Sequence, residues 1–194
     1  MSWRTGKIVA LHDETSTART IALAVPDWPG HVAGQHIDIR LTAPDGYSAV
    51  RSYSIGSAPT ADQRIEITVE RLENGEVSPY LTQEVAIGDE LEVRGPTGQW
   101  FVWRVNQPEP VQLIAGGSGV VPLMAMIRSR LASDSNARFR LLYSVREPAA
   151  VFSGSVHRAF GPHVPQRDRL GPPQLLNTAL QFGFGKRRGG PHID

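Results

Sequence analysis

The segment Arg51-Ser-Tyr-Ser-Ile-Gly-Ser57 brings a guanidinium, a phenol and several hydroxyls into one short extended stretch. On a strand, we expect Arg51, Tyr53 and Ser54 to present their side chains at one face. Such a face suits a flavin, because arginine pairs with a pyrophosphate oxygen, a phenol lies against the ring system and a serine hydroxyl reaches its N5 edge. An ordinary strand with an exposed arginine and a half-buried tyrosine has the same pattern, so this motif alone leaves both interpretations open.

Two glycine-containing segments are candidates for binding phosphate. Glu73-Asn-Gly-Glu-Val-Ser78 leads into a helix that we expect to start at Pro79, with Ser78 as its N-cap. Backbone N–H groups at such a start can bind an anion, although a simple turn would have the same sequence pattern.

The second segment, Gly116-Gly-Ser-Gly-Val-Val-Pro122, lies between a predicted strand and a predicted helix. Its spacing differs from Gly-x-Gly-x-x-Gly, and it also suits a purely architectural turn.

Alternating apolar residues and turn signals in the first hundred residues predict a small antiparallel barrel or sandwich. The expected strands cover residues 7–11, 20–25, 36–41, 51–55, 65–69 and 91–93, and one helix before Gly88 interrupts them. Next, residues 111–115 predict a strand buried on both faces, followed by a helix over 122–131 and a second buried strand over 139–145. This order is typical of a β-loop-α-β unit that starts a parallel sheet.

The last 44 residues contain 7 glycines, 5 prolines and no glutamate. We therefore expect residues 151–194 to be an irregular tail, with helix possible only around 175–176 and 179–180. The parallel sheet would then lack neighbours, and Leu113, Leu141 and Tyr143 would be under-covered.

The composition of the chain excludes several classes of functional site. The chain has no cysteine, which excludes disulfides, thiolate zinc sites, cysteine nucleophiles and a cysteine-ligated iron–sulfur cluster within it. The histidines lack metal-ligand spacing and no serine stands in a nucleophile elbow, so we expect no metal site and no hydrolytic triad. Without a long apolar run or a signal-peptide core, we expect a cytoplasmic protein with no membrane partner.

Charge is unevenly distributed along the chain. Residues 1–150 hold 14 Lys and Arg against 17 Asp and Glu, whereas residues 151–194 hold 6 against 2. A basic tail of this kind can contact nucleic acid or anionic lipid, but six charges scattered among glycines and prolines are typical of a solvated end. We therefore expect no nucleic-acid partner.

Taken in order, the motifs Arg-x-Tyr-Ser, Gly-x-Val-Ser, Gly-Pro-x-Gly and Gly-Gly-x-Gly-x-x-Pro closely resemble the ferredoxin–NADP reductase family, and its bacterial single-flavin branch most of all. The resemblance covers residues 3–148. It implies a six-stranded antiparallel Greek-key FAD-binding barrel followed by an α/β nicotinamide domain, with the flavin between them. We accordingly expect an FAD-binding barrel domain over 1–107, a partial NAD(P)-binding α/β domain over 108–150, and the tail over 151–194.

The resemblance also implies a role for each motif residue. Arg51 binds the FAD pyrophosphate, while the two expected catalytic residues are Tyr53, which stacks on the flavin, and Ser54, which lies near N5, where hydride arrives. The remaining expected contacts are Val69 at the ring edge; Gly75, Val77 and Ser78 around the pyrophosphate; Gly116, Gly117, Gly119 and Pro122 at the NADH or NADPH; and Ser144 and Arg146 at the adenosine ribose or its 2′-phosphate.

The resemblance thus implies a flavoprotein oxidoreductase that moves electrons from NAD(P)H through FAD to a separate redox partner such as ferredoxin. The family's Cys-Gly-Pro segment beside the nicotinamide is absent, and the tail does not continue the family pattern. Hydride transfer needs the nicotinamide held close to the flavin, so we expect reduction to be slow or absent. The alternative is an FAD-binding remnant without nicotinamide-dependent catalysis; a colourless barrel that serves only as a binding module is a third reading.

Overall fold

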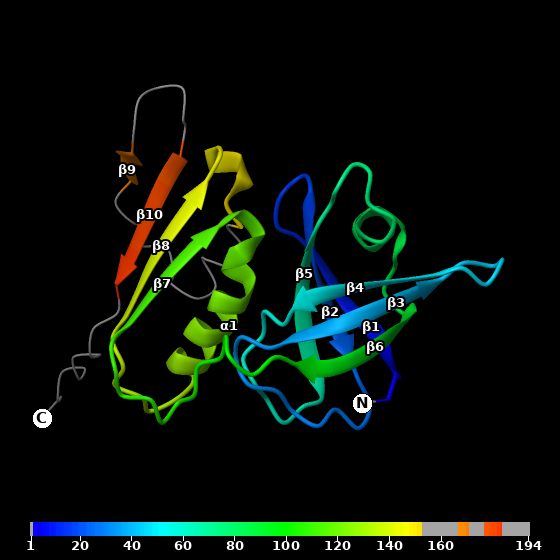
Figure 1. The fold of residues 1–194 in the computed structure, drawn as a ribbon, viewed down its shortest axis with the longest axis horizontal. Helices are drawn as coiled ribbons and strands as arrows, with labels where there is room; N and C mark the ends of the chain where they lie inside the picture. Colours follow the sequence, from blue (N-terminus) through cyan, green and yellow to red (C-terminus); the bar gives the residue numbers. More distant parts are fainter. Residues whose placement is uncertain (1, 153–166, 171–176, 184–194) are drawn as a thin grey trace, which may run out of the picture.

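The computed structural model describes residues 2–152, 167–170 and 177–183, and its strands form two sheets (Figure 1). The first sheet has the order β4-β3-β6-β1-β2-β5 and the second has the order β7-β8-β10-β9. The strands are β1 (Arg4–Asp13), β2 (Ala18–Ala24), β3 (His36–Thr42), β4 (Ser48–Ser54), β5 (Arg64–Glu70), β6 (Glu90–Thr97), β7 (Val111–Gly116), β8 (Phe139–Val145), β9 (Arg167–Leu170) and β10 (Asn177–Gly183). A single α-helix in the described residues, α1 (Val120–Leu131), lies between β7 and β8.

The first sheet is antiparallel throughout, and its two edge strands approach each other. Alternating residues of β3 and β5, such as Ile37, Ile39 and Ile67, are completely buried. Just beyond β4, Ile55 forms an isolated bridge with Ile67, and the Gly56 amide donates to the Glu66 carbonyl over 2.7 Å. The predicted strands of the first hundred residues are thereby confirmed, as alternation of apolar residues requires when one face of a sheet is buried.

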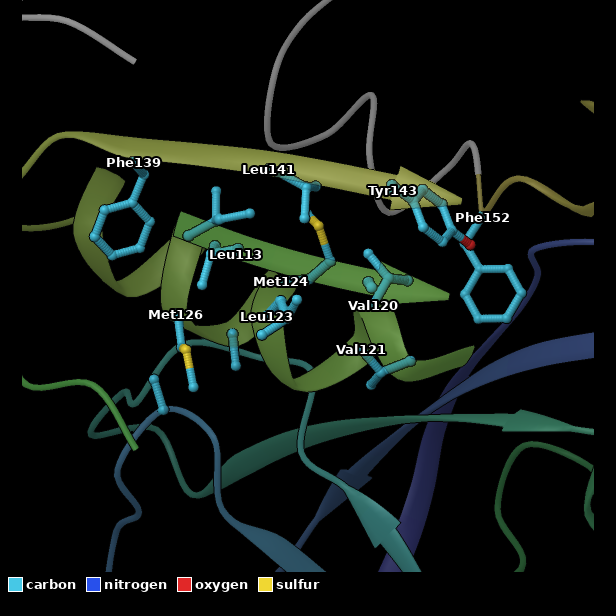
Figure 2. Close-up of a cluster of buried hydrophobic side chains, with 14 of the residues drawn as sticks. Leu113, Val120, Val121, Leu123, Met124, Met126, Phe139, Leu141, Tyr143 and Phe152 are labelled. Atoms are coloured by element: carbon cyan, nitrogen blue, oxygen red, sulfur yellow. The ribbon is translucent and has the colours of Figure 1, made fainter. Parts of the chain in front are cut away.

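The second sheet begins with the predicted parallel pair, since β7 and β8 run in the same direction and α1 covers one face (Figure 2). Leu113, Leu141 and Tyr143 are 4%, 1% and 0% exposed, so the prediction that they would be under-covered is wrong. The helix itself supplies the cover. The prediction that residues 111–115 form a strand buried on both faces is also wrong, because Ile114 on the opposite face is 69% exposed.

The prediction of an irregular tail is wrong where the structure describes the tail. β10 pairs antiparallel with β8, with Leu180 opposite Tyr143, and β9 pairs with β10. The possible helix at 179–180 is therefore a strand. The edge of β8 offers a row of backbone donors and acceptors, and pairing satisfies them even where side-chain periodicity is weak. The rest of the predicted tail after residue 152 lies outside the described residues.

The part of the chain that the structure describes contains neither a membrane-spanning helix nor a cluster of metal-binding side chains. No helix there is both long and apolar enough to cross a membrane. Within the same residues, no three or more His, Cys, Asp or Glu side chains gather in a way that could hold a metal ion.

Candidate cofactor site

Strand β4 carries the predicted arginine and tyrosine on the inner face of the barrel edge. In the register with β3, Arg51 stands opposite Ile39 and Tyr53 opposite Ile37. Directly paired residues share a face in antiparallel strands, so both side chains emerge next to the isoleucine core. Ser54 stands opposite His36 and points to the other face at the end of β4. The prediction of one face for all three residues is wrong for Ser54, because strand side chains alternate with a period of two.

The Arg51 guanidinium joins β4 to the loop before residue 80. Its Nη2 donates to Glu76 Oε2 over 2.8 Å, and its Nη1 donates to the Val50 carbonyl over 2.8 Å. The Tyr47 hydroxyl donates to the other oxygen of the same carboxylate over 3.1 Å. About half of the Arg51 side chain, 51%, is exposed, so the guanidinium can still reach a ligand. Glu76 was not predicted as a site residue, although its place inside the glycine loop was a usable signal.

Tyr53 is the aromatic group of this face. Its ring packs partly against the barrel core. Burial raises the pKa of the Tyr53 phenol to about 12, and the positive charge of Arg51 offsets a part of that shift. The phenol is therefore neutral at physiological pH, and it provides a flat, partly desolvated surface of the kind on which an aromatic ligand stacks.

The predicted phosphate loop is held by Ser78 from inside. The Leu72 amide donates to Ser78 Oγ over 3.0 Å, and the Gly75 amide donates to the Leu72 carbonyl over 2.9 Å. A side chain at Gly75 would place Cβ only 2.7 Å from Ser78 Oγ and 3.2 Å from the Leu72 carbonyl oxygen, so this tight turn favours glycine. Val77 and Ser78 are buried beneath the loop.

The helix after this loop differs from the prediction. It is one π-helical turn, Tyr80–Glu84, which follows Pro79 and has no side-chain cap. Ser78 as N-cap is therefore wrong, because its hydroxyl is already engaged by Leu72 within the loop. Val69 lies wholly in the barrel core, at 0% exposure, so its side chain offers no surface to a ring edge.

The second glycine loop lies at the carboxyl ends of the parallel strands. β7 ends at Gly116, residues Gly117–Gly119 form a 3₁₀ turn, and α1 starts at Val120 without a side-chain cap at its N-terminus. A Cβ added at any of the three glycines would meet no atom within 4 Å, so this side of the loop is open. Gly117 has φ +50°, in the left-handed region that favours glycine. An open glycine loop that leads into the N-terminus of a helix is an arrangement suited to a phosphate.

The other predicted nucleotide residues follow the same edge. Ser144 is the register partner of Gly116 on β8, so the parallel pairing brings it beside the glycine loop. Arg146 comes directly after β8 and is exposed. Pro122, in contrast, is buried in the first turn of α1 and serves the packing of the helix.

A junction connects the end of β4 and strand β5 with α1. Arg128 on α1 donates from Nη1 to the Gly56 carbonyl, and the same nitrogen lies 3.4 Å from Glu66 Oε2. A side chain at Gly56 would place Cβ 3.2 Å from Val121 Cγ1, so the helix packs closely on the chain just after β4. Trp103 meets Phe139 edge-on, with ring centroids 5.0 Å apart. These contacts pack α1 and β8 against the barrel.

The residues present fit an FAD. An exposed guanidinium, a half-buried phenol and the tight turn at Gly75 surround one edge of the barrel. They supply the donors that a pyrophosphate needs and the flat surface that a flavin ring needs. A barrel edge of this kind, next to a parallel strand-glycine loop-helix unit, defines the class of flavin-binding oxidoreductases.

Comparison with known proteins agrees with this class. Residues 8–102 match the family described as Oxidoreductase FAD-binding domain. Residues 8–102 therefore form a domain of the ferredoxin reductase-type FAD-binding family, and the resemblance stated from the motifs is confirmed.

Two relatives and one solved structure illustrate the similarity. The glycine betaine monooxygenase reductase subunit of Chromohalobacter salexigens is 37% identical over 116 residues, which cover 59% of this chain and 31% of that protein. The 3-ketosteroid-9-alpha-monooxygenase ferredoxin reductase component of Mycobacterium tuberculosis is 29% identical over 171 residues, 83% of this chain and 47% of that protein. The chain thus spans less than half the length of these relatives.

The fold is shared with the FAD/NAD-binding domain of a Vibrio cholerae nitric oxide dioxygenase. Its structure superposes with a TM-score of 0.68 at 22% sequence identity, covering 98% of this chain and 81% of that one. At this identity the likeness concerns the fold alone.

The raised pKa of Tyr53 leads to a test in alkaline solution. An unfolded tyrosine releases its proton near pH 10, whereas the folded chain holds the Tyr53 proton to about 12. The folded state therefore binds more protons in between, so we expect the free energy of unfolding to fall as pH rises from 10 to 12. Urea denaturation at several pH values should show a shallower fall for Tyr53→Phe. An unchanged slope would mean that the phenol is not shielded.

Proposed function

We propose that the chain binds one FAD and carries electrons from NADH or NADPH through the flavin to a separate acceptor protein. The observation that supports this most directly is the placement of Arg51 and Tyr53 on one face of β4, beside the Gly75 turn. We also propose that residues 1–107 form the FAD-binding domain and that the nicotinamide-binding part begins at residue 108.

Each residue of the first group has a proposed task. The Arg51 guanidinium binds the pyrophosphate by charge-assisted hydrogen bonds, and the backbone of Gly75, Val77 and Ser78 borders the same phosphates. Tyr53 lies against the ring system and excludes water from it. Ser54 emerges on the opposite face where β4 ends, so we propose that its hydroxyl meets the N5 edge of the ring and not its flat face. When bound, FAD supplies the redox chemistry by accepting two electrons and releasing them to the acceptor.

The second group is proposed to hold the nicotinamide cofactor. Gly116, Gly117 and Gly119, at which an added Cβ would meet no atom within 4 Å, let the dinucleotide approach the start of α1. Ser144 and Arg146, at the same edge, are placed to meet the adenosine ribose or a 2′-phosphate. An arginine favours the phosphate of NADPH, but it does not by itself decide between the two cofactors.

The acceptor is proposed from the relatives. Both are named as reductase parts of monooxygenase systems. For this chain we therefore propose delivery to a ferredoxin or to an oxygenase component.

FAD binding and FAD reduction can be measured one after the other on the same sample, and binding comes first. We expect titration with the folded protein to quench flavin fluorescence with a 1:1 stoichiometry. Unquenched flavin at saturating protein would contradict the proposal and support a colourless binding module.

Addition of NADH or NADPH under anaerobic conditions then separates the first two candidate functions. Bleaching of the bound flavin supports the reductase, whereas a yellow protein that does not respond supports an FAD-binding remnant. The expectation of slow or absent reduction was based on the missing Cys-Gly-Pro segment and on an unformed tail. Strands β9 and β10 remove the second reason, because they extend the sheet to which the proposed nucleotide loop belongs.

A further inference from the structure

We propose that Glu76 is an affinity-lowering residue of the flavin site, which competes with the FAD pyrophosphate for the Arg51 guanidinium. The inference rests on the proposed FAD binding and adds a residue that opposes it. It assigns a function to the residue between Gly75 and Val77 in the predicted phosphate loop.

The geometry places the carboxylate on the donors that a phosphate requires. Glu76 Oε2 accepts from Nη2 of Arg51 over 2.8 Å. A guanidinium offers two edges with paired donors, Nε with Nη2 and Nη1 with Nη2, and Nη2 belongs to both. The Val50 carbonyl already accepts from Nη1. A bidentate pyrophosphate must therefore share Nη2 with Glu76 or displace it.

Tyr47 helps to hold the Glu76 carboxylate in place. Its hydroxyl donates to Glu76 Oε1 over 3.1 Å, so each carboxylate oxygen has its own donor. The hydrogen bond to Glu76, together with the negative charge of that carboxylate, raises the pKa of the Tyr47 phenol. The carboxylate is thus held against Arg51 from two sides, although both partners of the ion pair are about half exposed.

Charge adds to the effect of shared donors. A pyrophosphate brings negative charge to within a few ångströms of the Glu76 carboxylate, and like charges at this range repel. When the carboxylate becomes an amide of the same shape, the repulsion disappears and the hydrogen bond to Arg51 becomes weaker. Glu76→Gln should therefore bind FAD more tightly than the wild-type chain.

The test is a fluorescence titration of FAD with wild type, Glu76→Gln and Glu73→Gln. Glu73 is exposed in the same loop and has the same charge change, so it controls for net charge. We expect Glu76→Gln to lower the Kd about three- to tenfold at low ionic strength, with less gain in high salt. Glu73→Gln should change it less than twofold. In an Arg51→Ala background, the gain from Glu76→Gln should shrink.

The outcomes are distinguishable. If the wild-type chain binds no FAD, the proposed function fails. If it binds FAD but Glu76→Gln binds equally or more weakly, Glu76 orders the arginine rather than competing for it, and this inference is overturned. An equal gain in both glutamine variants would also overturn it, because net charge alone would then explain the effect.

Discussion

Replacing Arg51 with alanine is expected to weaken FAD binding about ten- to a hundredfold. Arg51 is the exposed guanidinium on the inner face of β4, next to Tyr53 and the Gly75 turn. Charge-assisted hydrogen bonds to phosphate contribute roughly 1.5–3 kcal/mol, and every 1.4 kcal/mol is about a factor of ten in Kd. Fluorescence titration of FAD measures the change directly.

Two other arginines serve as controls for this experiment. Arg94 pairs with Asp38 over 2.8 Å and lies over the Trp3 ring, and Arg71 follows β5 near the loop. Arg71→Ala and Arg94→Ala should each weaken FAD binding less than Arg51→Ala does. If either proves more damaging, the assignment of the phosphate anchor to Arg51 is wrong.

The second large effect concerns stability, and we expect it from Phe139→Ala. Phe139 is 1% exposed and points from β8 toward α1 (Figure 2). Its ring makes a T-shaped contact with that of Trp103. Truncation of a buried phenylalanine typically costs about 3–5 kcal/mol through lost apolar contacts and the cavity that remains. Because whole domains are stable by only about 5–15 kcal/mol, the change in urea midpoint should be large.

Phe101→Ala is the matched control for this variant. It removes the same atoms from a side chain that is 57% exposed, and we expect a loss below about 1 kcal/mol. Equal losses for the two variants would show that Phe139 is not part of a packed core.

Much of the barrel was predictable from residue alternation alone. Ile37 and Ile39, or Ile65 and Ile67, reveal which face of each strand is buried. The strand-glycine loop-helix unit was equally clear, since an apolar run, a glycine cluster and a helical pattern follow one another. Local patterns of this kind are sufficient to predict an element because they indicate which of its faces is buried.

Errors arose where pairing or a non-local partner decided the outcome. Ser54 was placed with Arg51 although strand alternation assigns it to the other face, and Ser78 was read as a cap although Leu72 already engages its hydroxyl. β10 was missed because its place depends on the free edge of β8, which no window of sequence around residue 180 can indicate. The contact between Glu76 and Arg51 was missed for the same reason, because it exists only when β4 and the loop lie side by side.

Strand β1 determines when this barrel can form. It is bonded to β2 along one side and to β6 along the other, and Arg4 stands opposite Val93, roughly 90 residues later in the chain. At synthesis rates of about 5–20 residues per second, β6 leaves the ribosome about 4–18 s after β1. During that interval one edge of β1 has no partner of its own, and an unpaired edge accepts strands from other chains. The nascent protein is therefore most exposed to mispairing before its sixth strand emerges.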